Sequence, residues 1–218
     1  MLVRDRMTSP AITTRPDAET SAALKTMYVH KVRRLPVVDE RGALVGIVTQ
    51  RTLYEHGKAS TPVADLMTPS PYTAAPDTPI VEAAAKMRTL GFGALPVLEQ
   101  GRLVGIITES DIFDAFLELL GAGRAGTHLV VPVANVAAGV RAVLDALARA
   151  KAPLTGVATY IDRHGPEVVL TADEQDPRDL VRALREGGFE PTEISVQKTG
   201  GGHNVMTGES AARRSAGI

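Results

Sequence analysis

Two polar clusters in the sequence contain residue types that could bind a ligand. Thr108 and Asp111 stand in the run GIITESD, where a helix is expected to begin near Ser110. A carboxylate can accept hydrogen bonds from neighbouring hydroxyls, and a threonine hydroxyl with the free N–H groups of a helix start can bind phosphate. Arg33 and Arg34 precede the run LPVV, and the planar guanidinium suits phosphate because it makes paired, charged hydrogen bonds. Together the clusters suit a ligand that carries both hydroxyls and phosphate.

Each cluster also has a purely structural interpretation. Thr108 and Asp111 could simply cap the helix that follows them. Arg33 and Arg34 could belong to a solvated basic turn that pairs with acidic groups elsewhere. Residues 1–61 carry ten Lys and Arg against six Asp and Glu, whereas residues 62–122 carry three against eight. At the level of sequence both alternatives stay open.

The elements that must position these clusters come from an internal repeat. A shift of 60 places aligns identical residues in order, among them Leu35, Pro36 and Val37 with Leu95, Pro96 and Val97. After a one-residue deletion, GALVGIVT meets GRLVGIIT. We therefore expect two copies of one unit, over residues 1–61 and 62–122.

Each copy is expected to contain a short extended segment, a helix, two strands in a hairpin and a second helix. Residues 80–87 carry apolar side chains at helical spacing. The run LPVLEQGRLVGIIT contains two apolar, β-prone stretches around a glycine-containing turn. Residues 110–120 follow a helical pattern that Gly121 is placed to end. Thr108 and Asp111 are therefore expected where a strand passes into a helix.

Residues 127–197 do not repeat the first two units. Their apolar pattern predicts the order βαββαβ, which is that of a compact α+β sandwich. Residues 198–218 contain a glycine run and few large apolar residues, and we expect a mobile tail there. The fold class of the whole chain is accordingly predicted to be α+β.

The two repeats resemble cystathionine-β-synthase (CBS) domains, and the tandem pair resembles a Bateman module. The runs LPVVDERGALVGIVT and LPVLEQGRLVGIITESD carry this resemblance, each after an Ala-rich helix and preceded by MTSP or MTPSP. It implies two repeats in a pseudo-twofold arrangement that associate further into a homodimer. The third block resembles an ACT (ferredoxin-like) domain in its order of elements. A CBS pair followed by an ACT domain resembles the AcuB-type acetoin-utilisation proteins, which are regulators.

The CBS resemblance also implies a ligand and a composite site for it. The Thr-x-x-Asp pattern is the family's nucleotide signature, and an arginine before LPV resembles its phosphate-binding arginine. The implied ligand contains adenosine, as AMP, ADP, ATP or S-adenosylmethionine do. The implied site residues are Arg33 and Arg34 on phosphate, Thr108 and Asp111 on ribose and phosphate, and Thr73, Ala94 and Leu95 around the base. The first repeat departs from the pattern because Thr52 stands where the second has Asp111.

The third block contains a second possible ligand loop, between Asn135 and Gly139. The resemblance to ACT domains implies that this loop could hold a small ligand, frequently an amino acid, at a subunit interface. The family's usual acidic residue and Pro-Gly pair are absent here, which favours an unliganded dimerisation surface. An amino-acid sensor whose CBS pair is mainly a dimerisation scaffold is the alternative function.

Composition excludes several other classes of function. The chain has no Cys, so disulfide scaffolds, thiolate zinc sites and iron–sulfur clusters are excluded. The five His lack metal-ligand spacing, and no serine stands in a G-x-S-x-G run. We therefore expect no metal or redox cofactor and no enzyme.

Charge and hydropathy indicate the partners. The net charge of −1 and the 4% aromatic content do not favour nucleic acid. No apolar run approaches the roughly 18 to 20 residues that span a membrane, and a cytoplasmic protein is expected. The predicted function is regulatory ligand sensing through the ACT-like domain or a target protein.

Overall fold

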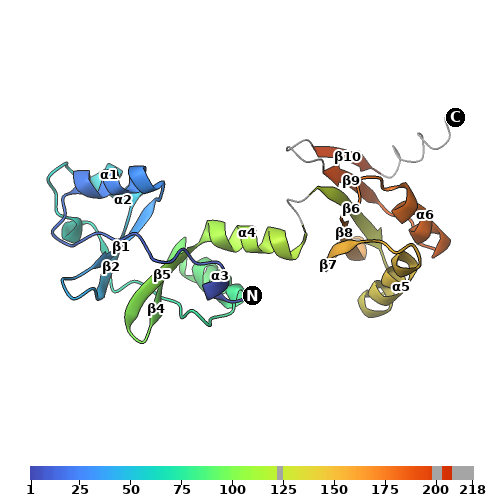
Figure 1. The fold of residues 1–218 in the computed structure, drawn as a ribbon, viewed down its shortest axis with the longest axis horizontal. Coiled ribbons are helices and arrows are strands. Elements are labelled where there is room, and N and C mark those ends of the chain that lie inside the picture. The colour runs from blue at the N-terminus through green and yellow to red at the C-terminus, as the bar shows by residue number, and fades with distance from the viewer. Residues whose placement is uncertain (122–124, 198–202, 208–218) are drawn as a thin grey trace. The chain divides into compact units, whose positions relative to one another are not determined.

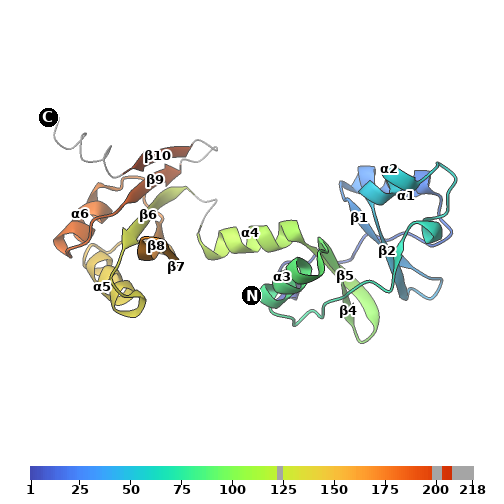
Figure 2. The same ribbon diagram turned by 180° about the vertical axis from the view of Figure 1, so that it is seen from behind.

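The computed structural model describes residues 1–121, 125–197 and 203–207, the last of these as backbone alone. The chain divides into two compact units, Met1–Ala115 and Phe116–Ile218 (Figures 1 and 2). Each unit has its own buried core. Among the described residues, no helix combines the length and the apolar character that crossing a bilayer requires.

The first unit contains the same succession of elements twice. The first repeat begins with a short 3-10 helix (Val3–Asp5) and continues with α1 (Thr20–His30), β1 (Arg34–Val38), β2 (Leu44–Thr49) and α2 (Gln50–His56). The second begins with Val63–Asp65 and β3 (Thr68–Pro69), followed by α3 (Ile80–Leu90), β4 (Ala94–Glu99), β5 (Arg102–Thr108) and α4 (Glu109–Leu119). The expected hairpins are present: β1 pairs with β2 and β4 with β5, both antiparallel.

The start of each repeat lies along the hairpin of the other. The backbone of Thr8 exchanges two hydrogen bonds with Ile106 of β5, at 2.9 and 3.0 Å. In the same way, β3 pairs with β2 through Thr68 and Ile47. This reciprocal exchange means that the surfaces next to each hairpin are built from both repeats.

Glycine in each hairpin permits this close approach. A Cβ at Gly105 would stand 2.8 Å from both the sulfur of Met7 and the carbonyl oxygen of Thr8, which is closer than real Cβ contacts allow. Gly46 meets Met67 and Thr68 in the equivalent place. The repeated Val-Gly-Ile run therefore carries glycine where another chain segment crosses the strand.

The core of the first unit consists of apolar side chains from helices and hairpins. In the first repeat Met27, Leu35, Val37 and Leu53 are all at least 99% buried. Their counterparts in the second repeat include Leu95 and Val97, which are fully buried. Burying these side chains fixes the hairpins against the helices and thereby places the strand ends that carry the polar clusters.

The second unit is a sheet with helices on one face. Its elements are β6 (Gly126–Pro132), α5 (Val136–Arg149), β7 (Leu154–Asp162), β8 (Gly165–Ala172), α6 (Arg178–Glu186), β9 (Glu193–Gln197) and β10 (His203–Thr207). The strand order among the described residues is β10-β9-β6-β8-β7, with every pair antiparallel. Leu129 and Leu170 of the sheet pack against Leu147 of α5 and Leu184 of α6.

The structure describes part of the segment expected to be a mobile tail. Residues 203–207 form β10, which pairs with β9 in the register His203 to Gln197. The exposed backbone edge of β9 explains this strand, because unpaired N–H and C=O groups at a sheet edge favour pairing with a further strand. The remaining positions of the expected tail, 198–202 and 208–218, lie outside the described residues.

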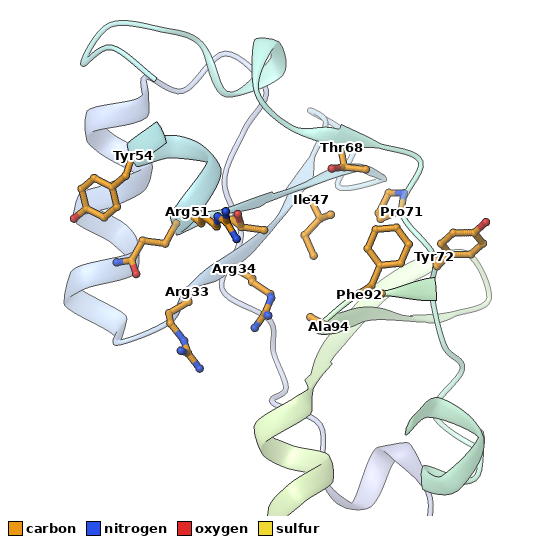
Figure 3. Close-up of a pocket in the computed structure, with 14 residues that line it drawn as sticks. Arg33, Arg34, Ile47, Arg51, Tyr54, Thr68, Pro71, Tyr72, Phe92 and Ala94 are labelled. Carbon is orange, nitrogen blue, oxygen red and sulfur yellow. The ribbon is translucent and has the colours of Figure 1, made fainter. Parts of the chain in front are cut away.

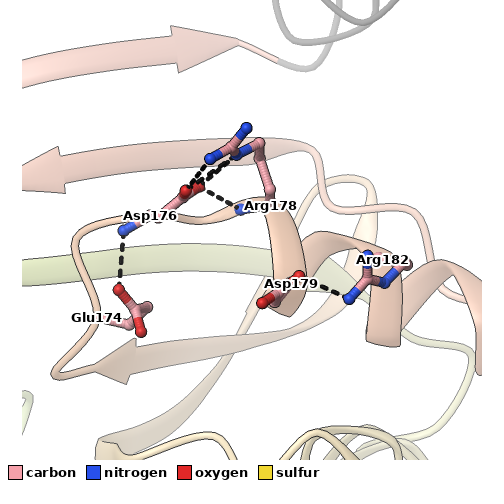
Figure 4. Close-up of polar contacts among 5 residues, drawn as sticks. All are labelled: Glu174, Asp176, Arg178, Asp179 and Arg182. Atoms are coloured by element: carbon pink, nitrogen blue, oxygen red, sulfur yellow. Dashed lines mark hydrogen bonds and ion pairs between the residues drawn. The ribbon is translucent and has the colours of Figure 1, made fainter.

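Charged residues hold the start of α6 (Figure 4). The Asp176 carboxylate accepts hydrogen bonds from the backbone N–H of Arg178 at 3.1 Å and from its Nε at 2.9 Å, and the two side chains form an ion pair. The hydrogen bonds from Arg178 lower the pKa of Asp176 to about 2. Asp179 and Arg182 form a second ion pair at 2.6 Å, one turn into the helix. These contacts fix the first turn of α6.

Candidate ligand-binding site

Thr108 and Asp111 form a reciprocal cap at the start of α4. Oδ2 of Asp111 accepts hydrogen bonds from the backbone N–H of Thr108 at 2.8 Å and from its hydroxyl at 2.7 Å. The backbone N–H of Asp111 points back to the Thr108 hydroxyl at 3.4 Å. Thr108 and Asp111 therefore do cap the helix that follows them, as the purely structural interpretation of this cluster expected. The cap occupies one carboxylate oxygen, and Oδ1 accepts no hydrogen bond from the part of the chain that the structure describes.

The first repeat achieves the equivalent cap without a carboxylate. The hydroxyl of Thr49 accepts from the backbone N–H of Thr52 at 3.1 Å, and the two hydroxyls lie 2.9 Å apart. Since threonine suffices to cap α2, capping alone does not require an acid at the start of α4. The carboxylate of Asp111 is therefore left with one oxygen that can serve a ligand.

Residues of both repeats line a cavity of about 200 Å³ beside Asp111. We name it the Asp111 cavity. The first repeat contributes Arg33 and Arg34, and the second contributes Thr108 and Asp111. Apolar lining comes from Ile12, Val32 and Ile106. The structure thus brings four of the seven expected nucleotide-binding residues to one cavity, and its lining combines cations, a carboxylate and an apolar wall.

The Arg34 side chain is partly buried beside a carboxylate. Its Nη2 lies 3.8 Å from Oε2 of Glu109, and its side chain is 25% exposed. Burial lowers the pKa of Arg34, an effect that the carboxylate of Glu109 opposes and the neighbouring Arg33 reinforces. A Cβ on Gly93 would collide with the guanidinium of Arg34 and with the carboxylate of Glu109. Gly93 therefore leaves the space that this ion pair occupies.

The other three expected residues lie elsewhere. Ala94 lines a neighbouring cavity. Leu95 lines neither cavity and is fully buried in the core, because successive residues of a strand point to opposite faces. Thr73 lines neither cavity, and its carbonyl accepts a hydrogen bond from Nζ of Lys86 at 2.7 Å, which ties it to α3. A contact of Leu95 or Thr73 with the base is therefore not supported.

The neighbouring cavity has a volume of about 430 Å³ and is the repeat-related counterpart of the first (Figure 3). We name it the Phe92 cavity. Its lining includes Arg51, Tyr72 and Phe92, which no motif in the sequence singled out. The repeat itself contains the signal that could have found them, because they occupy the places of Ser110, Ile12 and Val32 in the other copy. Arg33 and Arg34 line this cavity as well.

Asn135 and Gly139 have structural roles in the second unit. The Asn135 side chain caps α5 by accepting from the backbone N–H of Ala138 at 3.1 Å. Gly139 is buried in α5, where a Cβ would collide with the side chain of Val133. Packing thus fills the space around Gly139. Within the described residues, no group of three or more His, Asp or Glu is arranged to hold a metal ion.

Comparison with known proteins shows which family the first unit resembles. The CBS domain family matches residues 3–58 and 63–118, together more than half of the chain. A CBS domain-containing protein of Dictyostelium discoideum is 35% identical over 136 residues, which cover 55% of this chain and 94% of that protein. The chain also matches curated enzymes, a homoserine O-acetyltransferase and an L-aspartate semialdehyde sulfurtransferase, of which it covers 23% each.

Solved structures similar to the first unit include the following two. The CBS domain pair of protein MJ0100, in complex with 5′-methylthioadenosine and S-adenosyl-L-methionine, has a TM-score of 0.51 and 33% identity, covering 53% of this chain and 95% of that one. A Vibrio cholerae protein assigned to acetoin utilization (AcuB) has a TM-score of 0.51 and 32% identity, covering 56% and 93%. With the repeated hairpins and the reciprocal pairing of the two copies, these matches establish that the chain belongs to the CBS domain family.

Proposed function

We propose that the Asp111 cavity binds an adenosine-containing ligand and that the protein is a regulatory sensor of this ligand. One observation carries the proposal: the cations of the first repeat and the Thr-x-x-Asp cluster of the second line the same cavity. The solved CBS pair with 5′-methylthioadenosine and S-adenosyl-L-methionine supports an adenosyl group as the ligand.

The chemistry of the lining suggests how such a ligand would bind. Oδ1 of Asp111 can accept from a ribose hydroxyl, and Arg33 and Arg34 can donate to phosphate. Ile12 and Ile106 offer an apolar surface for the base. Two adjacent arginines favour a ligand with negative charge, so we infer AMP, ADP or ATP ahead of S-adenosylmethionine.

We infer that ligand binding acts on the second unit through α4. Its first turn contains Asp111, and the residue after its end, Leu120, accepts a hydrogen bond from the hydroxyl of Thr171 in β8 at 2.7 Å. A ligand that moves the start of α4 could thereby act on the sheet. The strand order β9-β6-β8-β7, with both helices on one face, supports the ACT-like interpretation of this unit.

The surface of the first unit supports a homodimer. Tyr28 and Val29 of α1 are 83% and 62% exposed, and Tyr54 of α2 is 69% exposed. Large exposed apolar side chains favour association, and a second copy of the chain is the proposed partner. The likeness to the Vibrio cholerae protein supports acetoin utilisation as the first process in which to seek a target protein.

Calorimetric titration of the full chain with AMP, ADP, ATP and S-adenosylmethionine tests the proposal. The variant Asp111→Thr copies the first repeat, in which the Thr49 hydroxyl accepts from the backbone N–H of Thr52, while removing the carboxylate. We expect AMP to bind about 10- to 100-fold more weakly, as the loss of a hydrogen bond to a charged group implies.

The matched control is Asp114→Ala, which removes an exposed acid of the same helix that lines neither cavity. It should leave the affinity unchanged. Equal AMP affinity in the wild type and Asp111→Thr would show that the carboxylate serves only the helix cap.

A further inference from the structure

Lys31 stands at a backbone position that favours glycine. At the end of α1 its φ is 54° and its ψ is 36°, in the left-handed region. The equivalent residue at the end of α3 is Gly91, with a φ of 71° and a ψ of 25°. In both turns the next residue donates its backbone N–H to a carbonyl one turn back, at 3.0 Å. A Cβ is disfavoured in this conformation, so the turn itself does not require a lysine.

The position of Lys31 in the fold gives it a second role. It lines the Asp111 cavity together with Arg33 and Arg34, so three cations from four consecutive positions meet one cavity. Residues other than glycine that are held in the left-handed region gather at ligand sites, where the surrounding structure maintains them against the strain. The lysine therefore brings a positive charge to the cavity that the glycine of the other repeat does not.

The three cations differ in how far they are already neutralised. Nη2 of Arg34 lies 3.8 Å from the carboxylate of Glu109, and the Arg34 side chain is 25% exposed. Lys31 and Arg33 are exposed, and within the described residues no carboxylate lies at ion-pair distance from either. The positive charge of these two side chains is accordingly available to an anion.

The number of available cations bears on the number of phosphates in the ligand. A single phosphate, as in AMP, can be bound by the two arginines alone. ADP and ATP add further negative charge, which is stabilised by cations that have no other partner. The ammonium of a lysine acts on phosphate as a point charge at the end of a flexible stem, so Lys31 can follow a longer phosphate chain.

We propose that Lys31 is a specificity-determining residue of the Asp111 cavity, which favours nucleotides with two or three phosphates over AMP. This inference rests on the proposed function, because it requires a nucleotide in that cavity. The strained backbone of Lys31 is retained for the charge that its side chain supplies. The sensor therefore responds to ADP and ATP at lower concentrations than to AMP.

Calorimetric titration of the full chain with AMP and with ATP tests this role. Mg²⁺ is left out, so that only the cations of the protein meet the phosphates. The wild type should bind ATP more tightly than AMP. Lys31→Gly should weaken ATP binding about 10-fold and AMP binding less than twofold. Its melting temperature should not fall, because glycine suits this backbone conformation.

A second variant separates the charge from the backbone. Lys31→Gln removes the ammonium but keeps a side chain in the left-handed conformation, and it should weaken ATP binding as much as Lys31→Gly does. Lys151→Gly is the matched control. Lys151 follows the end of α5 with a φ of 53° and lines neither the Asp111 cavity nor the Phe92 cavity, so both affinities should stay unchanged.

The outcomes distinguish this inference from the proposed function. If ATP binds the wild type no more tightly than AMP, or if Lys31→Gln keeps the wild-type affinity for ATP, the role of Lys31 is overturned and the nucleotide site stands. Equal losses for AMP and ATP in both Lys31 variants would also overturn the preference for longer phosphate chains. If neither nucleotide binds the wild type, the proposed function fails and this inference fails with it.

Discussion

At the scale of single residues, equivalent positions of the two repeats can be compared directly. Thr52 and Asp111 occupy the same place at the start of a helix, and both positions take part in a cap. Only Asp111 has a second side-chain oxygen, Oδ1, which the cap does not use and which can accept from another partner. The difference between the two cavities therefore comes down to a few substitutions within a duplicated frame, and each substitution can be transferred from one copy to the other.

Gly93 allows a test of the arginine site. A Cβ at this position would collide with the Arg34 and Glu109 side chains, so Gly93→Ala should displace the guanidinium. We expect AMP to bind about 10-fold more weakly, which corresponds to about 1.4 kcal/mol, in calorimetric titrations. Adenosine, which has no phosphate, should bind the variant and the wild type equally. An equal loss for adenosine and AMP would mean that the substitution damages the cavity generally.

At the scale of elements, helix starts carry much of the polar chemistry of this chain. α2, α4 and α5 each begin with a side chain that accepts a backbone N–H. The first turn of α6 is instead fixed by Asp176, which accepts from the backbone N–H of Arg178 and forms an ion pair with its side chain. Such caps satisfy backbone donors that have no partner within the helix, and they also bring polar side chains to the ends of strands.

The cap of α6 predicts a dependence on pH. The pKa of Asp176 is lowered from 3.8 to about 2 in the folded chain, so its contribution to stability is fully present above about pH 4 and is lost as the pH falls through 2. We expect an NMR titration of the Asp176 carboxyl carbon to have its midpoint near 2. In Arg178→Ala the midpoint should move up towards the ordinary value. A wild-type midpoint near 3.8 would show that the pair does not form in solution.

At the scale of the whole molecule, the boundary between the two units falls within the residues of α4. Residues Glu109–Ala115 of α4 lie in the first unit, and the helix ends in the second. After its end, the carbonyl of Leu120 is bound by the hydroxyl of Thr171, which is 2% exposed. Gly156 permits this approach, because a Cβ there would collide with the same carbonyl. Leu120, the residue after α4, is therefore packed onto β7 and β8 of its own unit.

Thr171→Val should separate ligand binding from its effect on the second unit. The variant keeps the shape of the side chain and removes both the hydrogen bond to Leu120 and the 3.1 Å contact with Nδ1 of His128, at a cost of about 1 kcal/mol in stability for each. AMP affinity should stay within about twofold of the wild type, since the lost contacts lie outside the cavity. Hydrogen exchange is the measurement: in the wild type AMP should change the exchange of β8 amides, and in the variant this change should disappear.

A persistent change in β8 exchange would show that the signal takes another route. Ser195→Ala is a suitable control, because it removes a hydroxyl from β9, in the same sheet, without altering the contact at Leu120. This control should retain the AMP-dependent change.

The sequence alone determined the elements of this protein and their duplication. The repeat predicted two hairpins, and it placed Thr108 and Asp111 at a junction of strand and helix, because local periodicity and capping residues act over a few positions. The CBS resemblance then identified the arginines of the first repeat as partners of that cluster, and the structure brings them to one cavity.

The tertiary structure alone decided which neighbours line each cavity. A single step along β4 separates Ala94, in a cavity lining, from Leu95, in the core, and only the packing of the strand tells the two faces apart. Tyr72 and Phe92 join residues of the first repeat because β3 pairs with β2 across the repeat boundary. Such contacts link positions far apart in the chain, so no local pattern contains them.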